Sequence, residues 1–208
     1  MKISWITDAG IRAETSQGLI LFNHYENTLN ESSQKDENTI AIFLNENLKK
    51  NSEKKLLSST VSIFEPGEYE VNNIPIQSHA IRLNTENLDE SVNIYSIISE
   101  GMTICYLDEI SKITIPANIT ESIGKIDILV CLSDDSSDKS VESINSLLSS
   151  LDPKILIIAE KNSNQDTTEI YQKLIKGLGH SVEDSVINAN ITKSSISDAL
   201  KVVNLRKS

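Results

Sequence analysis

Few side chains in this sequence are suited to nucleophilic catalysis or to binding a transition metal. Cysteine occurs twice and histidine three times. Cys105 and Cys131 lie inside apolar runs that predict buried strands, whereas a reactive thiolate needs an exposed, electropositive position. His79 follows a strand-like run and could replace a metal ligand, but zinc needs several ligands with hydrogen-bonded partners of their own. We therefore expect His79 to be packed and hydrogen-bonded rather than metal-bound.

The acidic run Asp134-Asp135-Ser136-Ser137-Asp138 follows a predicted strand and could bind a cation. It lacks the ligand spacing of a calcium loop, and Asp138 is better used as the N-cap of a helix. The sequence also contains neither a Gly-X-Ser-X-Gly nucleophile elbow nor a glycine-rich phosphate loop, and it has only seven glycines. Serine-nucleophile catalysis and nucleotide binding are therefore unsupported.

The net charge limits the partners that this protein can bind. Its 208 residues, which we interpret as one domain (residues 1–208), carry a formal charge of −11. A surface of that sign repels nucleic-acid phosphates and anionic lipid head groups. No apolar run approaches the length of a membrane span, and residues 1–6 enter a strand pattern without a signal-peptide segment. We expect an acidic cytoplasmic protein that binds neither nucleic acid nor membranes.

Short apolar runs separated by turn residues crowd the first two thirds of the chain, which predicts an antiparallel sheet. Gln17-Gly18 and Asn72-Asn73 separate neighbouring runs, and residues that tolerate positive φ make tight hairpins there. The expected strands cover residues 2–6, 11–15, 19–22, 39–44, 60–64, 69–71, 74–77 and 92–98.

Helices alternate with very apolar strands after residue 107. Apolar residues recur at helical spacing from Asp138 to a point before Pro153, and again over residues 170–178. The runs 126–132 and 154–159 are continuously apolar, as in strands that are covered on both faces. Helices are therefore expected to flank a sheet.

The segment Phe64-Glu65-Pro66-Gly67-Glu68-Tyr69-Glu70-Val71 resembles the Gly-Pro-Gly-Glu-Tyr-Glu signature of a group of metallo-β-lactamase-fold, zinc-dependent hydrolase-like proteins. From the residues alone, Pro66-Gly67 is simply a turn. Further anchors agree in order as far as about Gly179: Met1-Lys2-Ile3-Ser4-Trp5, Asn93-Ile94-Tyr95, residues 101–110, Gly124-Lys125-Ile126-Asp127-Ile128-Leu129 and Asp152-Pro153-Lys154-Ile155. The resemblance implies an α+β fold, a four-layer αββα sandwich.

In active members of this superfamily, the first metal ligands form a His-X-His-X-Asp-His run after a strand. The corresponding residues here, after the run 39–44, are Asn45-Glu46-Asn47-Leu48-Lys49-Lys50. A protonated lysine has no lone pair to donate, and two ammonium groups repel a dication. The resemblance therefore implies that the zinc motif is degenerate.

The later ligands are altered too. Glu109 corresponds to the bridging aspartate and Glu160 to the terminal histidine, while Thr7-Asp8-Ala9 corresponds to Gly-His-Ser and Asn23-His24 to Asp-Pro. Three histidines are too few for the usual ligand set. We expect the former metal-site positions to line a vestigial pocket: Asp8, Asn45, Glu46, Asn47, Lys49, Lys50, Glu109 and Glu160.

Two arrangements of Lys49 and Lys50 remain open. If the fold brings the carboxylates of this set together, the two ammonium groups would stand where metal charge once stood, in an ion network. Alternatively, both lysines belong to an exposed amphipathic helix that runs to Leu57, with Leu48, Leu56 and Leu57 facing inward.

Two functions from different classes follow. We expect a pseudoenzyme without catalytic residues, metal or cofactor that serves as a binding or interaction module for a protein or small molecule. The alternative is a hydrolase in which the carboxylates bind Mg²⁺ or Mn²⁺ and activate water, which the two lysines oppose. An unrelated α+β domain would instead lack two facing sheets. The sequence identifies neither the ligand nor the oligomeric state.

Overall fold

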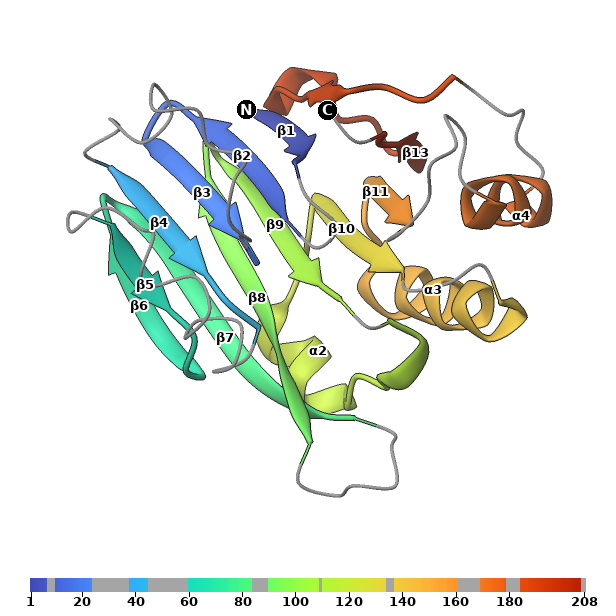
Figure 1. Cartoon of the computed structure of the whole chain (residues 1–208), viewed down its shortest axis with the longest axis horizontal. Helices are drawn as coiled ribbons and strands as arrows, with labels where there is room; N and C mark the ends of the chain where they lie inside the picture. Colours follow the sequence, from blue (N-terminus) through green and yellow to red (C-terminus); the bar gives the residue numbers. More distant parts are fainter. Residues whose placement is uncertain are drawn as a thin grey trace.

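Two β-sheets face each other in the computed structural model of this chain (Figure 1). Sheet A has six strands in the order β12-β1-β2-β3-β4-β5, and sheet B has seven in the order β13-β11-β10-β9-β8-β7-β6. The predicted two-sheet α/β sandwich is thus confirmed. The structure describes residues 1–6, 10–23, 38–44, 60–83, 90–108, 110–133, 137–160, 169–178 and 184–206, without the side chains of Ser111 and Glu160.

Sheet A is mixed, so the prediction of a wholly antiparallel sheet was wrong for this half. Strands β1, β2 and β3 are antiparallel, but β3 pairs with β4 and β4 with β5 in parallel. Parallel neighbours need a crossover of about a dozen residues or more, and long connections of that kind follow β3 and β4. The strands of sheet A are β1 (Lys2–Trp5), β2 (Ile11–Thr15), β3 (Gly18–Phe22), β4 (Thr39–Ile42), β5 (Val61–Ile63) and β12 (Asn188–Asn190).

Sheet B changes from antiparallel to parallel along its width. Strands β6 to β9 are antiparallel, whereas β9, β10, β11 and β13 are parallel. Every residue of β10 is buried, as its continuous apolar run predicted. The strands are β6 (Gly67–Val71), β7 (Ile74–Arg82), β8 (Ser91–Ser99), β9 (Met102–Leu107), β10 (Ile128–Ser133), β11 (Ile155–Glu160) and β13 (Lys201–Asn204).

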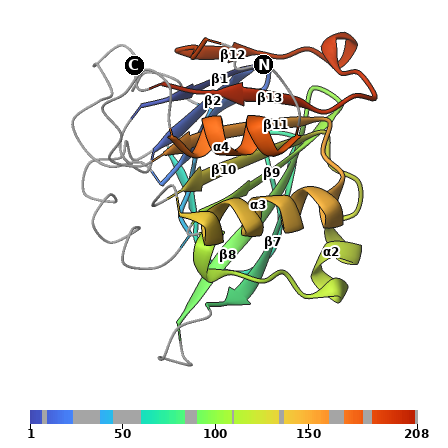
Figure 2. The ribbon, with the colours of Figure 1, turned by 90° about the vertical axis from the view of Figure 1, so that its right-hand side faces the viewer.

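The described helices cover the outer face of sheet B (Figure 2). They are the α-helices α2 (Ala117–Ile123), α3 (Asp138–Leu151) and α4 (Glu169–Leu178). Two 3-10 turns are also described, η3 (Ile110–Lys112) and η4 (Lys193–Ser195). None of them is long and apolar enough to cross a membrane. On the other side of the sandwich, Leu19 and Leu21 form a separate buried cluster with Ile6 on the outer face of sheet A. Both sheets therefore have two apolar faces, as the predicted four-layer arrangement requires.

Helix α3 begins one residue earlier than predicted. The hydroxyl of Ser137, rather than the carboxylate of Asp138, accepts a hydrogen bond from the Ser140 N–H at 3.2 Å. Both residue types cap helices well, and the extended backbone of Ser137 decides between them. Asp138 instead lies in the first turn, where a negative charge complements the helix dipole.

Two predicted hairpins are confirmed by their backbone angles. Asn72 and Asn73 have φ values of 54° and 58° between β6 and β7, as a tight hairpin turn requires. Gly18 has a φ of 148°, and a Cβ atom at this position would overlap the Asn38 carbonyl oxygen. Both turns therefore depend on residues that tolerate unusual backbone conformations.

The core is aliphatic, and both cysteines lie in it as free thiols. Burial raises the pKa of the Cys105 thiol to about 12. Burial raises the pKa of the Cys131 thiol well above its usual range, and electrostatic repulsion from the nearby Cys105 and Asp108 raises it further. Both thiols therefore stay protonated, as expected for core residues.

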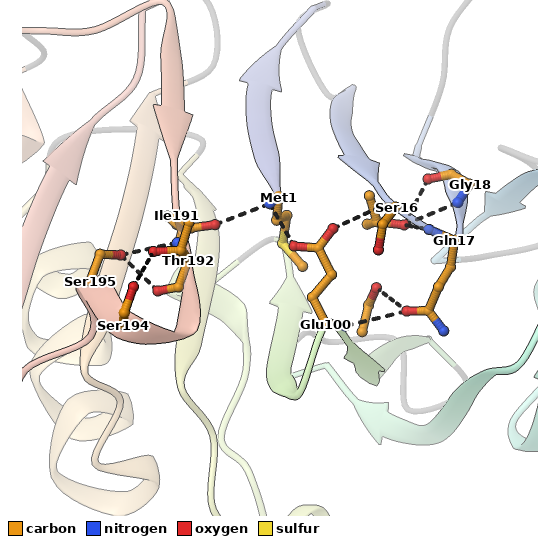
Figure 3. Close-up of polar contacts among 11 residues, drawn as sticks. Met1, Ser16, Gln17, Gly18, Glu100, Ile191, Thr192, Ser194 and Ser195 are labelled. Carbon is orange, nitrogen blue, oxygen red and sulfur yellow. Dashed lines mark hydrogen bonds and ion pairs between the residues drawn. The ribbon is translucent and has the colours of Figure 1, made fainter.

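The N-terminus links the two sheets at one end of the sandwich (Figure 3). The Met1 amino group donates to Glu100 Oε2 at 2.6 Å and to the Ile191 carbonyl oxygen at 3.0 Å. Glu100, in the β8–β9 hairpin of sheet B, also accepts the Ser16 N–H of the β2–β3 turn at 2.7 Å. One carboxylate thus bridges the first strands of sheet A to sheet B.

Replacing this carboxylate should make folding less stable in a pH-dependent way. Hydrogen bonding from the N-terminal amino group lowers the pKa of Glu100 below its ordinary 4.5, and burial opposes this only in part. Because the pKa is lower in the folded state, the stabilisation is present above pH 4.5 and is lost as the pH falls through the folded-state value. Glu100→Gln should cost about 1–2 kcal/mol at pH 7, and chemical denaturation from pH 7 to pH 3 should show this difference shrinking.

The matched control for this experiment is Glu14→Gln. Glu14 pairs with Lys2 at 3.1 Å and with Arg12 at 3.3 Å, and about two fifths of the Glu14 side chain is exposed. An exposed pair of this kind contributes about 0–1 kcal/mol. Equal losses in the two variants, or a Glu100→Gln loss that does not depend on pH, would contradict the proposed role of Glu100.

Candidate functional site at the strand ends

The predicted site residues follow the carboxyl ends of strands that point the same way. Strands β1, β3 and β4 share one direction in sheet A, as do β9, β10 and β11 in sheet B. Asn23, directly after β3, contacts Asp108, directly after β9, so these ends meet at one end of the sandwich. Such an end is where α/β sheets usually bind ligands.

Of the predicted site residues, only Glu160 lies within the described part of the chain. The backbone of Glu160 is described at the end of β11, but its side chain is not. The other members lie outside the described residues: Asp8, Asn45, Glu46, Asn47, Lys49, Lys50 and Glu109. The vestigial pocket and the orientation of both lysines therefore stay predictions, while the strand ends that precede them do converge.

Asn23 joins three of these strand ends. It has a φ of 46° and is 1% exposed. Its Nδ2 donates to the Tyr106 hydroxyl at 3.1 Å and lies 3.4 Å from Asp108 Oδ2, while its Oδ1 accepts the Leu44 N–H at 3.1 Å. A single buried amide therefore connects β3 and β4 of sheet A to β9 of sheet B.

Aromatic packing supports this amide. The rings of Phe22 and Tyr106 stack across the two sheets with centroids 4.3 Å apart. Asp108 is 3% exposed, so its carboxylate is taken out of water and depends on neighbouring donors such as the Asn23 amide. We call Asn23, Tyr106 and Asp108, together with Asn93 and Tyr95, the strand-end cluster.

Asn93 and Tyr95 extend the cluster along β8. Asn93 Nδ2 donates to the Phe64 carbonyl oxygen, and the Tyr95 hydroxyl donates to the Phe43 carbonyl oxygen at 2.7 Å. Burial raises the pKa of Tyr95 to about 12, although the neighbouring Ser78 and Asn93 side chains lower it in part. Tyr95 therefore stays neutral near pH 7 and acts as a hydrogen-bond donor rather than as a general base.

His79 lies on the opposite face of sheet B from this cluster. Tyr95 reaches sheet A and is paired with Ser78, so Ser78 faces the sandwich interior. Successive residues of a strand point to opposite faces, so His79, paired with Ile94, faces outward. It cannot replace a ligand at the strand ends.

The described side chains do not form a zinc site. A zinc ion takes three or four donors from histidine, cysteine and carboxylate side chains. Within the described part of the chain, no group of three or more such residues is arranged to hold a metal ion. Asp108 supplies one carboxylate at the strand ends, and one of its neighbours there is the Asn23 amide.

Residues 2–159 match the family model described as a β-lactamase superfamily domain. This chain belongs to that family. The fold brings the strand-end cluster to the ends of β3, β4 and β9, and several of the predicted site residues follow β4 and β9 in the sequence. No protein with a curated description matches this member of the β-lactamase superfamily at a significant level.

Solved structures agree on the fold. A provisionally assigned Zn-dependent hydrolase of the metallo-β-lactamase superfamily from Thermotoga maritima has a TM-score of 0.69 at 18% identity, covering 98% of this chain and 97% of that one. The metallo hydrolase Igni18 from Ignicoccus hospitalis has a TM-score of 0.57 at 9% identity, covering 92% and 99%. The metallo-β-lactamase fold protein YhfI from Bacillus subtilis has a TM-score of 0.57 at 9% identity, covering 100% and 97%. Identities this low show the fold alone.

The sequence prediction did not include the members of the strand-end cluster among its site residues. One signal was available, because Asn23 and Asp108 are polar residues placed directly after apolar runs. The sequence correspondence instead put Glu109 in the position of the bridging aspartate. Only the pairing of the two sheets showed that Asp108 is buried beside Asn23.

Deleting the Asn23 amide should destabilise the protein without straining its backbone. Asn23→Gly keeps the positive φ accessible. It leaves the Leu44 N–H and the Asp108 carboxylate each with one hydrogen-bond partner fewer, which should lower the free energy of unfolding by about 2 kcal/mol. Asn72→Gly is the matched control, because Asn72 also has a positive φ but is exposed. In urea unfolding, the control Asn72→Gly should change the free energy of unfolding by less than about 0.5 kcal/mol. A loss below that limit in Asn23→Gly would show that the amide does not join the strand ends.

Proposed function

We propose that this protein has lost the zinc chemistry of its superfamily and acts as a binding or interaction module. The observation that carries the proposal is the Asn23 amide, which connects β3, β4 and β9 by hydrogen bonds at the place expected for metal ligands. Its Nδ2 is directed at the Asp108 carboxylate. An N–H donor in that position gives the buried carboxylate a partner that is not a cation.

The sequence supports the same conclusion. Lys49 and Lys50 follow β4, where the superfamily places an Asp-His pair, and protonated lysines oppose a dication. The chain has three histidines, and the described one, His79, faces away from the strand ends. With imidazole ligands missing, we expect the former pocket to bind a protein segment or a small molecule rather than to hydrolyse a substrate.

A metal-dependent hydrolase with oxygen ligands is the second candidate. Asp108 favours it, because this buried carboxylate lies at the strand ends, and Asp8, Glu46, Glu109 and Glu160 follow or end neighbouring strands in the sequence. Mg²⁺ and Mn²⁺ accept such ligands, and a bound ion of this kind would lower the pKa of its water.

Metal analysis separates the two candidates. We expect purified protein, equilibrated with Zn²⁺ or Mn²⁺ and then dialysed, to retain far less than one ion per chain by plasma mass spectrometry. A site with a Kd of about 10 µM would give about 2.7 kcal/mol of stabilisation at about 1 mM Mn²⁺, which raises Tm by about 5–10 °C for a chain of this size. We expect no such rise.

Asp108→Asn decides the result if a metal is found. Stoichiometric Mn²⁺ that is lost in Asp108→Asn, but retained in the exposed control Asp198→Asn, would refute the proposal and favour the hydrolase candidate. A Tm that is independent of Mn²⁺ in wild type and in both variants supports the binding module.

A further inference from the structure

A groove of about 420 Å³ crosses the outer face of sheet B beside α2. Strands β6 to β9 and α2 line it, and the side chain of Gln77 donates to the Ser122 hydroxyl of α2 at 3.1 Å. Helices α3 and α4 cover the parallel half of the sheet, whereas the short α2 covers only part of the antiparallel half (Figure 2). The groove thus lies where the helical layer is incomplete.

Ile98 marks this gap in the covering layer. Residues of β8 that alternate with Tyr95 face outward from the sandwich. Along this row, Val92, Ile94 and Ser96 are 5%, 0% and 7% exposed, but Ile98 is 48% exposed and lines the groove. An isoleucine on the groove wall, beside Pro75 and Ile123, is a contact point for an apolar partner surface.

The β6 side of the groove carries negative charge. Glu68 lines it, and the exposed Glu70 and Glu121 lie on the adjacent β6 and α2. Residues 60–81, which form β5, β6 and most of β7, contain three glutamates and neither lysine nor arginine. Acidic groups around an apolar contact point select a partner of opposite charge.

We propose that this groove docks a cationic amphipathic segment of a partner protein, with Ile98 contacting its apolar face and Glu68 and Glu70 its positive charges. A second copy of this chain is a poor occupant, because it carries a net charge of −11 and would bring equivalent glutamates together. The groove is separate from the strand-end cluster. Metal binding there and peptide binding here can therefore succeed or fail independently.

The probe is a fluorescein-labelled peptide of about 14 residues that contains only leucine and lysine, with leucines at helical spacing. A scrambled peptide of the same composition measures general charge attraction. In fluorescence anisotropy we expect the amphipathic peptide to bind, and Ile98→Ser or the double variant Glu68→Gln, Glu70→Gln to weaken it about tenfold. Circular dichroism of each variant checks that the fold is retained.

The chain offers matched controls for both changes. Val61→Ser removes a hydrophobic side chain of similar exposure, 41%, from β5 of sheet A. The double variant Glu142→Gln, Glu169→Gln removes two exposed charges from α3 and α4. Both controls should change peptide affinity by less than about twofold, because neither alters the groove.

Three results would overturn the proposal. The first is a scrambled peptide that binds as tightly as the amphipathic one, together with equal losses of peptide affinity in the groove variants and the control variants. This result would indicate general charge attraction. The second is an absence of peptide binding at about 1 mM protein. The third is a wild-type dimer in sedimentation that Ile98→Ser dissociates, because a second copy would then occupy the groove.

Discussion

The two sheets of this protein are joined at their ends by polar contacts, which include a backbone hydrogen bond from the Asn93 N–H of β8 to the Leu44 carbonyl oxygen after β4, at 3.1 Å. In the described structure, the Asn23 amide joins three strands. It follows β3 and contacts Leu44 after β4, Tyr106 in β9 and Asp108 after β9. It works because the amide carries both donors and an acceptor and because asparagine tolerates the positive φ that ends β3. The stacked rings of Phe22 and Tyr106 and the buried side chain of Asp108 lie beside this amide.

The opposite end of the sandwich is joined by ionic contacts. Glu100 binds the Met1 amino group and the Ser16 N–H, while Asp127 accepts hydrogen bonds from the Thr103 N–H and from Lys193. Between the two ends the sheets pack through aliphatic side chains that have no directional preference. The polar contacts at the ends therefore set how the sheets are aligned, and the apolar middle supplies most of the free energy of packing.

Under the proposed function, this division would allow a superfamily scaffold to persist without a metal. Hydrophobic burial between the sheets does not require an ion at the strand ends, and an amide can satisfy the polar groups there. Under the proposed function, substitution of the ligands leaves a stable sandwich whose strand-end loops and outer faces are free to recognise other molecules.

The sequence by itself determined the local elements, because apolar alternation, continuous apolar runs and Asn72-Asn73 act over a few residues. It also predicted the superfamily fold from ordered motifs. Tertiary structure alone decided that β3, β4 and β5 are parallel, that the short β12 and β13 complete the sheets, and that His79 faces outward. The Asn23–Asp108 contact spans 85 positions of the chain, and no local pattern encodes a pairing that depends on how two sheets align.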